Sequence, residues 1–233
     1  MSITLRIGRV FGIPIEVNIS WLVVFVLLTY LLANEFADAN LHWSAAQRWS
    51  VAMATVFLFF TSVLAHELSH SVMALSKGIP VRSITLFIFG GVSRLDQEPQ
   101  QPFTEFLVAL VGPLLSLLLA AIFGSAWFLL GRGNSALEVV LLLLAWTNLS
   151  LGVFNLVPGY PLDGGRLLRA GIWGMTGNYL RATKIAAALG QVVGGAMVLA
   201  GVILMVKIEP VDGVWIGVVG IFLFSIARGS YPK

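Results

Sequence analysis

Residues 62–75 read SVLAHELSHSVMAL and place His66, Glu67 and His70 in the middle of an apolar run. Charged side chains at the centre of a bilayer cost roughly 2.5 to 3.5 kcal/mol each on insertion scales, so they persist there mainly where they have a function. On a helix, residues i and i+4 lie on one face about 6 Å apart along the axis, so two imidazoles can reach one metal ion. The stretch therefore indicates a metal site on a hydrophobic helix.

The composition of the chain is that of an integral membrane protein. Of its 233 residues, 58% are hydrophobic and 11% are charged, whereas soluble domains carry about 25% charged residues. A membrane span needs about 20 apolar residues. Six uncharged runs are candidates, the last two of them shorter: residues 17–34, 106–131, 139–162, 185–206, 49–65 and 213–227. The run that starts at residue 49 can continue to Ser76, which makes one long helix that carries HELSH.

Basic residues are distributed unevenly over the connections between these spans. With the N-terminus inside and six crossings, eleven of the 14 Lys and Arg residues fall on the inner side, and Arg48, Arg132 and Lys207 fall on the outer side. Cytoplasmic loops carry such an excess, so we expect a multi-pass protein of the cell (inner) membrane with both termini in the cytoplasm. The charges form no contiguous stripe, so nucleic acid is not an expected partner.

The segment between the second and third spans has a different pattern. Residues 81–100, VRSITLFIFGGVSRLDQEPQ, are rich in β-branched and aromatic residues on both sides of Gly90 and Gly91, which predicts a β-hairpin over residues 83–95. The expected fold is an all-α polytopic membrane protein of about six transmembrane helices, with a short membrane-associated β-hairpin between helices two and three. We expect residues 1–233 to form a single domain without a PDZ or CBS domain.

The H-E-x-x-H spacing is typical of a zinc site. In such sites the two histidines are ligands, and the glutamate takes a proton from the water that attacks an amide carbonyl. A chance occurrence of the pentapeptide would bury three polar groups of an apolar helix without compensation. We therefore predict one Zn²⁺ per chain, with His66 and His70 as ligands and Glu67 as the base.

A catalytic zinc usually has three protein ligands, and few side chains can supply the third. The chain has no cysteine, and its remaining histidine, His42, falls in an outer loop. Glu105 and Glu138 lie at the starts of their spans, Glu138 on the far side. Asp163 lies in the Pro- and Gly-rich turn that ends the fourth helix, on the same side as HELSH, so elimination favours it. The alternative is that Asp163 only caps the segment that follows.

Two asparagines precede this turn on the fourth helix. Asn155, near its end, can donate a hydrogen bond to the oxyanion that forms when a carbonyl is attacked. For Asn148 we favour an interhelical hydrogen bond. Arg166 and Arg169 are most simply interpreted as anchors near the lipid headgroups.

Together these motifs resemble the site-2 protease family of intramembrane zinc metalloproteases, over essentially the whole chain. The motifs are HELSH, the Gly90-Gly91 pair in a hairpin, the Gly112-Pro113 pair, and the N-x-x-P-x-x-P-x-D-G pattern of residues 155–164. The resemblance implies a substrate that is itself a transmembrane segment of another protein.

The resemblance also implies a role for each polar residue of the site. His66, His70 and Asp163 would be the zinc ligands, Glu67 the catalytic base and Asn155 a donor to the transition state. The expected partners are a transmembrane protein substrate and the lipid bilayer, and the sequence makes no prediction about the oligomeric state.

Two classes of function are consistent with the polar cluster. The first is an intramembrane endopeptidase that hydrolyses a peptide bond near the cytoplasmic side. The second is an ion-coupled transporter or channel that uses the same residues as an ion pathway, although such transporters usually repeat a broken helix in two halves. A scaffold with a structural zinc is a weaker third option, because such zinc normally has four protein ligands.

A helical substrate must unwind before it can be cut, because its carbonyls are engaged within the helix. The predicted hairpin offers replacement hydrogen bonds, so we expect the substrate to add as a strand to its edge. Under this hypothesis, Phe87→Pro or Phe89→Pro impairs cleavage by removing a backbone donor.

Overall fold

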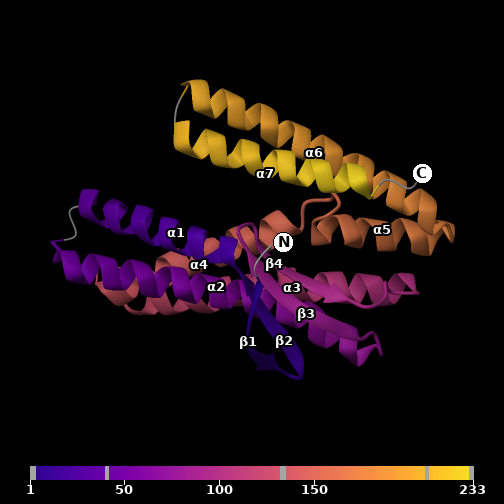
Figure 1. Ribbon diagram of the computed structural model, residues 1–233, viewed down its shortest axis with the longest axis horizontal. Coiled ribbons are helices and arrows are strands. Elements are labelled where there is room, and N and C mark those ends of the chain that lie inside the picture. The colour runs from indigo at the N-terminus through magenta and orange to yellow at the C-terminus, as the bar shows by residue number, and fades with distance from the viewer. Residues whose placement is uncertain (1–3, 40–41, 132–134, 208–209, 231–233) are drawn as a thin grey trace. The chain divides into compact units, whose positions relative to one another are not determined.

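The structure is a computed structural model that describes residues 4–39, 42–131, 135–207 and 210–230 (Figure 1). The chain divides into two compact units. Unit one holds Met1–Glu98 and Leu114–Gly152, and unit two holds Pro99–Pro113 and Val153–Lys233. The boundaries cross α3 (Pro102–Leu129) and α4 (Ala136–Asn155), so both helices contribute to both units.

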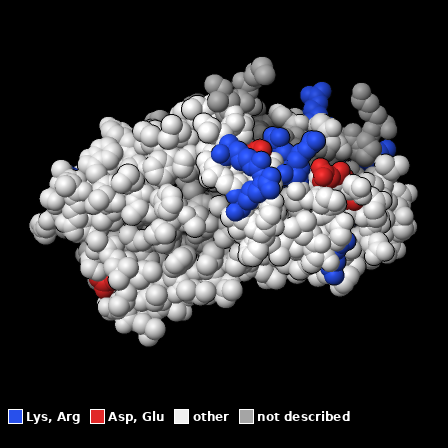
Figure 2. Space-filling view, turned by 60° about the horizontal axis from the view of Figure 1, so that its bottom comes forward, with Lys and Arg blue, Asp and Glu red and all other residues white. Residues whose placement is uncertain are grey.

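Among the described residues, six helices are long and apolar enough to span a membrane, which confirms the expected number. These spans are α1 (Ile19–Asp38), α2 (Ala45–Ser76), α3, α4, α6 (Tyr179–Lys207) and residues Asp212–Gly229 of α7 (Pro210–Gly229). Broad areas of the face shown in Figure 2 carry no charged side chain, as a lipid-facing surface requires. The chain is a multi-pass membrane protein.

Unit one contains a sheet that is larger than the expected hairpin. Its strands are β1 (Thr4–Val10), β2 (Ile13–Asn18), β3 (Val81–Phe87) and β4 (Gly90–Leu95), and they lie in the order β1-β2-β3-β4. The β3-β4 pair is the predicted hairpin, and β2 adds to it in parallel, with Ile15 opposite Ile84. Residues 4–18 therefore form two strands that the sequence analysis did not predict, and α1 begins directly after them.

The sheet packs against the C-terminal part of α2. Ile13, Ile15 and Ile84 are each at most 2% exposed, and Leu64 and Leu68 of α2 pack against them. The two α2 residues are four apart and share one face of the helix. This contact determines which face of α2 packs against the strands. The opposite face of α2 therefore points away from the sheet.

Side-chain caps define where the first two helices begin. Asn18 Oδ1 accepts from the amide of Ser20 at 3.0 Å, and Ser44 Oγ accepts from the amide of Gln47 at 3.2 Å. Each cap satisfies an amide that has no partner within its own helix. The caps explain the sharp change from β2 to α1 and the start of α2.

Unit two contains α5 (Asp163–Thr176), α6 and α7, together with the N-terminal part of α3 and the end of α4. Helices α6 and α7 run side by side, and α5 packs against α6 (Figure 1). A Cβ on Gly194 would lie 2.7 Å from the amide nitrogen of Phe224, and one on Gly201 would lie 2.6 Å from that of Gly217. Glycine is therefore required where the backbones of α6 and α7 approach most closely.

Candidate metal centre

The two histidines of HELSH converge within α2. The Nε2 atoms of His66 and His70 are 3.2 Å apart, and the two residues are 3% and 4% exposed. The i, i+4 spacing places both rings on one face of the helix, as the sequence predicts. Buried imidazole nitrogens that point at the same space form half of a tetrahedral metal site, so this pair fits a zinc ion.

A serine of α3 sets the orientation of the first histidine. Ser116 Oγ lies 2.9 Å from Nδ1 of His66, and Ser116 is 0% exposed. When Nδ1 carries its proton and donates to this hydroxyl, Nε2 presents its lone pair to a metal. Ser116 is not among the residues predicted from the sequence. The feature of the sequence that points to Ser116 is a hydroxyl group in an apolar helix, three residues after Pro113.

The predicted base, Glu67, lies beside strand β4. The Ser93 hydroxyl is 2.8 Å from Oε2 of Glu67 and 3.0 Å from its backbone carbonyl oxygen. Ser71, one helical turn further along α2, donates to the same carbonyl at 3.0 Å and lies 3.1 Å from Ser93 Oγ. The structure thus places the Glu67 carboxylate in contact with a strand of the sheet.

Asn148 has the role that the sequence favoured. Its Nδ2 donates to Ser62 Oγ at 3.2 Å and to the carbonyl of Leu144 at 2.8 Å. The first bond joins α4 to α2, so the prediction of an interhelical hydrogen bond is confirmed. Ser62 lies four residues before His66, and therefore on the same face of α2 as the two histidines.

The other two predicted site residues lie in unit two. Asn155 is the last residue of α4, and Asp163 is the first residue of α5. The N-cap of α5 is Leu162, which makes no side-chain cap bond, so Asp163 is not the cap that the alternative interpretation requires. Asp163 is 7% exposed, and its Oδ1 lies 3.8 Å from Nη1 of Arg166.

Glycines hold the irregular segment 156–162 tightly against its neighbours. A Cβ on Gly164 would lie 2.3 Å from the carbonyl oxygen of Leu156, and one on Gly165 would lie 2.2 Å from the amide nitrogen of Tyr160. That amide donates to the carbonyl of Ala186 in α6 at 3.0 Å. The Pro-Gly segment is therefore clamped by direct backbone contact with α5 and α6, and this contact fixes where α5, with Asp163, begins.

Arg169 is not the lipid-headgroup anchor that the sequence analysis expected. It is 5% exposed, and its Nε donates to Oε1 of Glu105 at 2.7 Å, while Glu105 is 0% exposed. The guanidinium also lies 5.5 Å from the ring centre of Tyr160 and 5.1 Å from that of Tyr179. A buried arginine requires such a carboxylate partner, and an ion pair between residues 64 positions apart has no local sequence signal.

Burial reduces the choice of metal ligands within the described part of the chain. There, four His, Asp and Glu side chains are buried: His66, His70, Glu105 and Asp163. Glu105 is engaged by Arg169, as described above. Asp163 is therefore the buried carboxylate that does not belong to this ion pair.

The fold and the histidine pair define a class: polytopic membrane proteins with two adjacent, buried histidines inside a spanning helix. A family model described as peptidase family M50 matches residues 54–132 and 132–201. These ranges include HELSH and the segment from Asn155 to Asp163. The chain belongs to peptidase family M50, and the resemblance to the site-2 proteases is confirmed.

Curated relatives cover almost the whole chain. A putative zinc metalloprotease, sll0528 of Synechocystis, is 38% identical over 99% of this chain and 60% of its own length. The putative zinc metalloprotease Rip3 of Mycobacterium tuberculosis is 39% identical over 98% of this chain and 58% of its own length. The chain thus spans about 60% of the length of these relatives.

A solved structure shares the fold. The site-2 protease from Methanocaldococcus jannaschii aligns with a TM-score of 0.66 and 29% sequence identity. The alignment covers 99% of this chain and 96% of that chain. The fold is therefore that of a site-2 protease.

Proposed function

We propose that the chain is an intramembrane zinc endopeptidase that hydrolyses a peptide bond in or near the transmembrane segment of another membrane protein. The observation that carries the proposal is the convergence of the Nε2 atoms of His66 and His70 to 3.2 Å on a spanning helix, with Glu67 next in sequence to His66. Membership in peptidase family M50 and the names of the relatives support the same activity.

The proposed ligand set for one zinc is His66, His70 and Asp163. Burial supports Asp163, because the other buried carboxylate, Glu105, accepts a 2.7 Å hydrogen bond from Arg169, whereas the ion pair of Asp163 with Arg166 is longer, at 3.8 Å. Two imidazoles and a carboxylate leave an open position, which distinguishes a catalytic zinc from a structural one. We propose that residues 1–233 form one protease domain around this set.

The protein side chains supply proton transfer and positioning. When bound, the zinc acts as a Lewis acid toward water and the scissile carbonyl. Glu67 takes a proton from the attacking water and returns it to the amine that leaves. Asn155 donates a hydrogen bond from its carboxamide to the carbonyl oxygen as negative charge develops there.

Zinc content and cleavage test the proposal together. Purified wild-type protein in liposomes is expected to contain one zinc per chain and to cut a transmembrane peptide that carries a helix-breaking residue. Glu67→Gln is expected to keep the zinc and to lose cleavage by at least about a hundredfold, since a positioned base contributes about that much. Cleavage by this variant at the wild-type rate would refute the assigned base.

The same preparation tests the transporter alternative. A transporter or channel would move ions across the liposome membrane, and Glu67→Gln would reduce that flux, whereas a protease cuts peptide without any flux. Flux that depends on Glu67, together with intact peptide, would replace the proposed function by the alternative.

We propose that the active site faces the cytoplasm of the cell (inner) membrane, together with both termini. The six spans and the excess of basic residues on one side support this orientation. Because the chain has no cysteine, single cysteines at His42 and Ser135 are expected to react with an impermeant reagent from outside. Cysteines at Gln97 and Ser230 are expected to react only from the cytoplasm, and the reverse pattern would invert the orientation.

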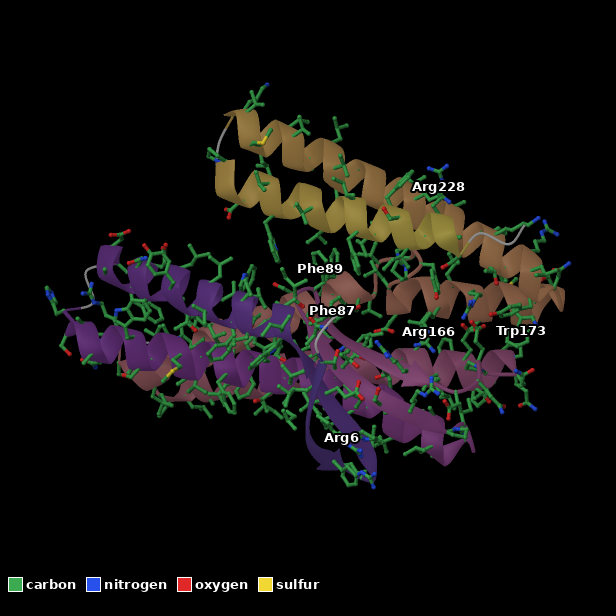
Figure 3. The ribbon with its side chains drawn as sticks, in the orientation of Figure 1. Arg6, Phe87, Phe89, Arg166, Trp173 and Arg228 are labelled. Atoms are coloured by element: carbon green, nitrogen blue, oxygen red, sulfur yellow. The ribbon has the colours of Figure 1, made fainter. Side chains whose placement is uncertain are left out.

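The substrate is proposed to pair with β4, which has a single strand neighbour, β3, among the described residues. The proline variants suggested by the sequence are poorly placed. Phe87 ends the inner strand β3, and Phe89 lies in the turn (Figure 3). The two rings contact each other edge to face, with centroids 6.1 Å apart.

Disulfide cross-linking tests the pairing at β4 directly. A cysteine at Val92, which is 42% exposed in β4, is expected to cross-link to cysteines placed near the cut site of the peptide. A cysteine at Ile7, 63% exposed in the opposite edge strand β1, is the matched control. Equal cross-linking at both positions would exclude β4 as the specific site of strand addition.

A further inference from the structure

The hydroxyl of Ser93 contacts the Glu67 carboxylate from the neighbouring strand. Ser93 Oγ is 2.8 Å from Oε2 of Glu67, a normal length for a hydrogen bond from a hydroxyl to an oxygen acceptor. Glu67 is half-buried, and among the described contacts this is the one that joins its carboxylate to the sheet.

The protons of the two serines can be assigned from their partners. Ser71 Oγ is 3.0 Å from the carbonyl oxygen of Glu67, the usual back-bond of a helical serine to the residue four positions earlier. Ser93 Oγ lies 3.0 Å from the same carbonyl oxygen and 2.8 Å from the carboxylate oxygen, so the carboxylate is the nearer acceptor for its proton. A charged acceptor also forms the stronger hydrogen bond.

A second residue of β4 approaches the same side chain. A Cβ on Gly91 would lie 2.5 Å from Cγ of Glu67 and 3.3 Å from its Cδ. Gly91 and Ser93 are two residues apart, so both face α2 from the same side of the strand. Glycine at 91 lets the strand approach Glu67, and serine at 93 gives the strand a donor at that position.

We infer that Ser93 is a positioning residue that holds the carboxylate of Glu67 for proton transfer, and that strand β4 thereby couples substrate pairing to the position of the base. The inference rests on the proposed function, because it assigns Glu67 as the base. A substrate strand that pairs with β4 would fix the backbone of Ser93, and with it the rotamer of Glu67. The consequence is an effect of Ser93 on turnover rather than on zinc binding.

The chain offers a closely matched control. Ser83, in the adjacent strand β3, also places its hydroxyl near a carboxylate, with Oγ 3.3 Å from Oε2 of Glu16. Ser83→Ala and Ser93→Ala therefore remove the same group from neighbouring strands, but only Ser93 contacts Glu67. A general effect of a lost hydroxyl on the sheet is expected to appear in both variants.

The experiment measures kcat, KM and zinc content for zinc-loaded wild type, Ser93→Ala, Ser93→Thr and Ser83→Ala with one transmembrane peptide in liposomes. We expect kcat of Ser93→Ala to fall about tenfold or more, because small displacements of a catalytic group cost up to about a hundredfold. Its KM and zinc content are expected to stay at the wild-type values. Ser93→Thr keeps the hydroxyl and is expected to recover most of kcat.

The outcomes separate this inference from the proposed function. If neither wild type nor Glu67→Gln cuts the peptide, the proposed function fails. If wild type cuts, Glu67→Gln does not, and Ser93→Ala keeps its kcat, only the positioning role is overturned. An equal loss of kcat in Ser83→Ala, or a Ser93→Thr variant no better than Ser93→Ala, would also overturn it.

Discussion

The proposed ligands of the two units are held in place in different ways. His66 and His70 belong to the 32-residue helix α2, and the i, i+4 period of that helix brings their rings together. Asp163 begins the 14-residue helix α5 after an irregular segment, and backbone contacts at Gly164 and Gly165 determine where that helix begins. The first arrangement depends on secondary structure, and the second depends on tertiary packing.

This difference predicts how each unit responds to substitution. A regular helix keeps its spacing when a neighbouring side chain is lost, so changes around α2 should alter metal binding more than stability. The position of α5 depends on a buried ion pair and on close backbone approach, so changes there should destabilise unit two first. Substitutions in the two units test this contrast.

The largest effect is expected from breaking the buried pair of Glu105 and Arg169. Glu105→Leu leaves the Arg169 guanidinium buried without its carboxylate, which typically costs about 3 to 5 kcal/mol. The free energy of unfolding can be measured by titrating the protein in mild detergent with a denaturing detergent. Glu105→Leu combined with Arg169→Met removes both charges and is expected to recover most of the loss. A double variant no more stable than Glu105→Leu would show that the ion pair is not the cause.

A smaller effect is expected from adding one methyl group at the start of α5. Gly164→Ala places a Cβ 2.3 Å from the Leu156 carbonyl oxygen, so the segment must shift, at a cost of about 1 to 3 kcal/mol. Gly171→Ala is the control on the same helix, because a Cβ there has no neighbour within 4 Å. The control is expected to be neutral or slightly stabilising, since alanine favours a helix over glycine by up to about 1 kcal/mol. Equal unfolding free energies for the two variants would contradict the packing argument.

The sequence was most informative where the site follows a regular period. The spacing of HELSH predicted which side chains share a face of α2, and the β-branched run predicted the β3-β4 hairpin. The remaining half of the sheet was missed: β1 and β2 form a local antiparallel hairpin, with Val10 opposite Ile13. Its attachment to the rest of the sheet is the parallel pairing of β2 with β3, which lies about 70 residues away along the chain. No local pattern encodes such a parallel pairing.

Long-range polar contacts were missed for the same reason. The position of Arg169 near the end of a span favours an anchor at the lipid headgroups, yet its partner is Glu105, 64 residues away along the chain. Ser116 and Ser93 lie 50 and 26 residues from the side chains that they contact. The sequence thus offered candidate ligands and a candidate base, but not the polar groups that contact them.

Removal of the Ser116 hydroxyl tests the other side of the contrast. Ser116→Ala is expected to weaken zinc binding about tenfold to a hundredfold, the usual effect of losing a partner of a metal-bound histidine. Zinc affinity is measured by competition with a chelator. Ser125→Ala removes an exposed hydroxyl from the same helix and should leave zinc affinity unchanged. Unaltered affinity in Ser116→Ala would show that His66 is oriented without this bond.

The smallest effect is expected at the bond between α4 and α2. Asn148 Nδ2 donates to Ser62 Oγ at 3.2 Å, and interhelical hydrogen bonds in membranes average about 0.6 kcal/mol. Asn148→Leu, Ser62→Ala and the double variant form a cycle that isolates this pair from the volume change of each substitution. We expect a coupling free energy of about 0.6 kcal/mol from the detergent titration and an unchanged zinc affinity, because the i, i+4 spacing of His66 and His70 does not depend on α4. A coupling above about 2 kcal/mol, accompanied by loss of zinc, would contradict the contrast. It would show that α2, like α5, depends on tertiary contacts to present its ligands.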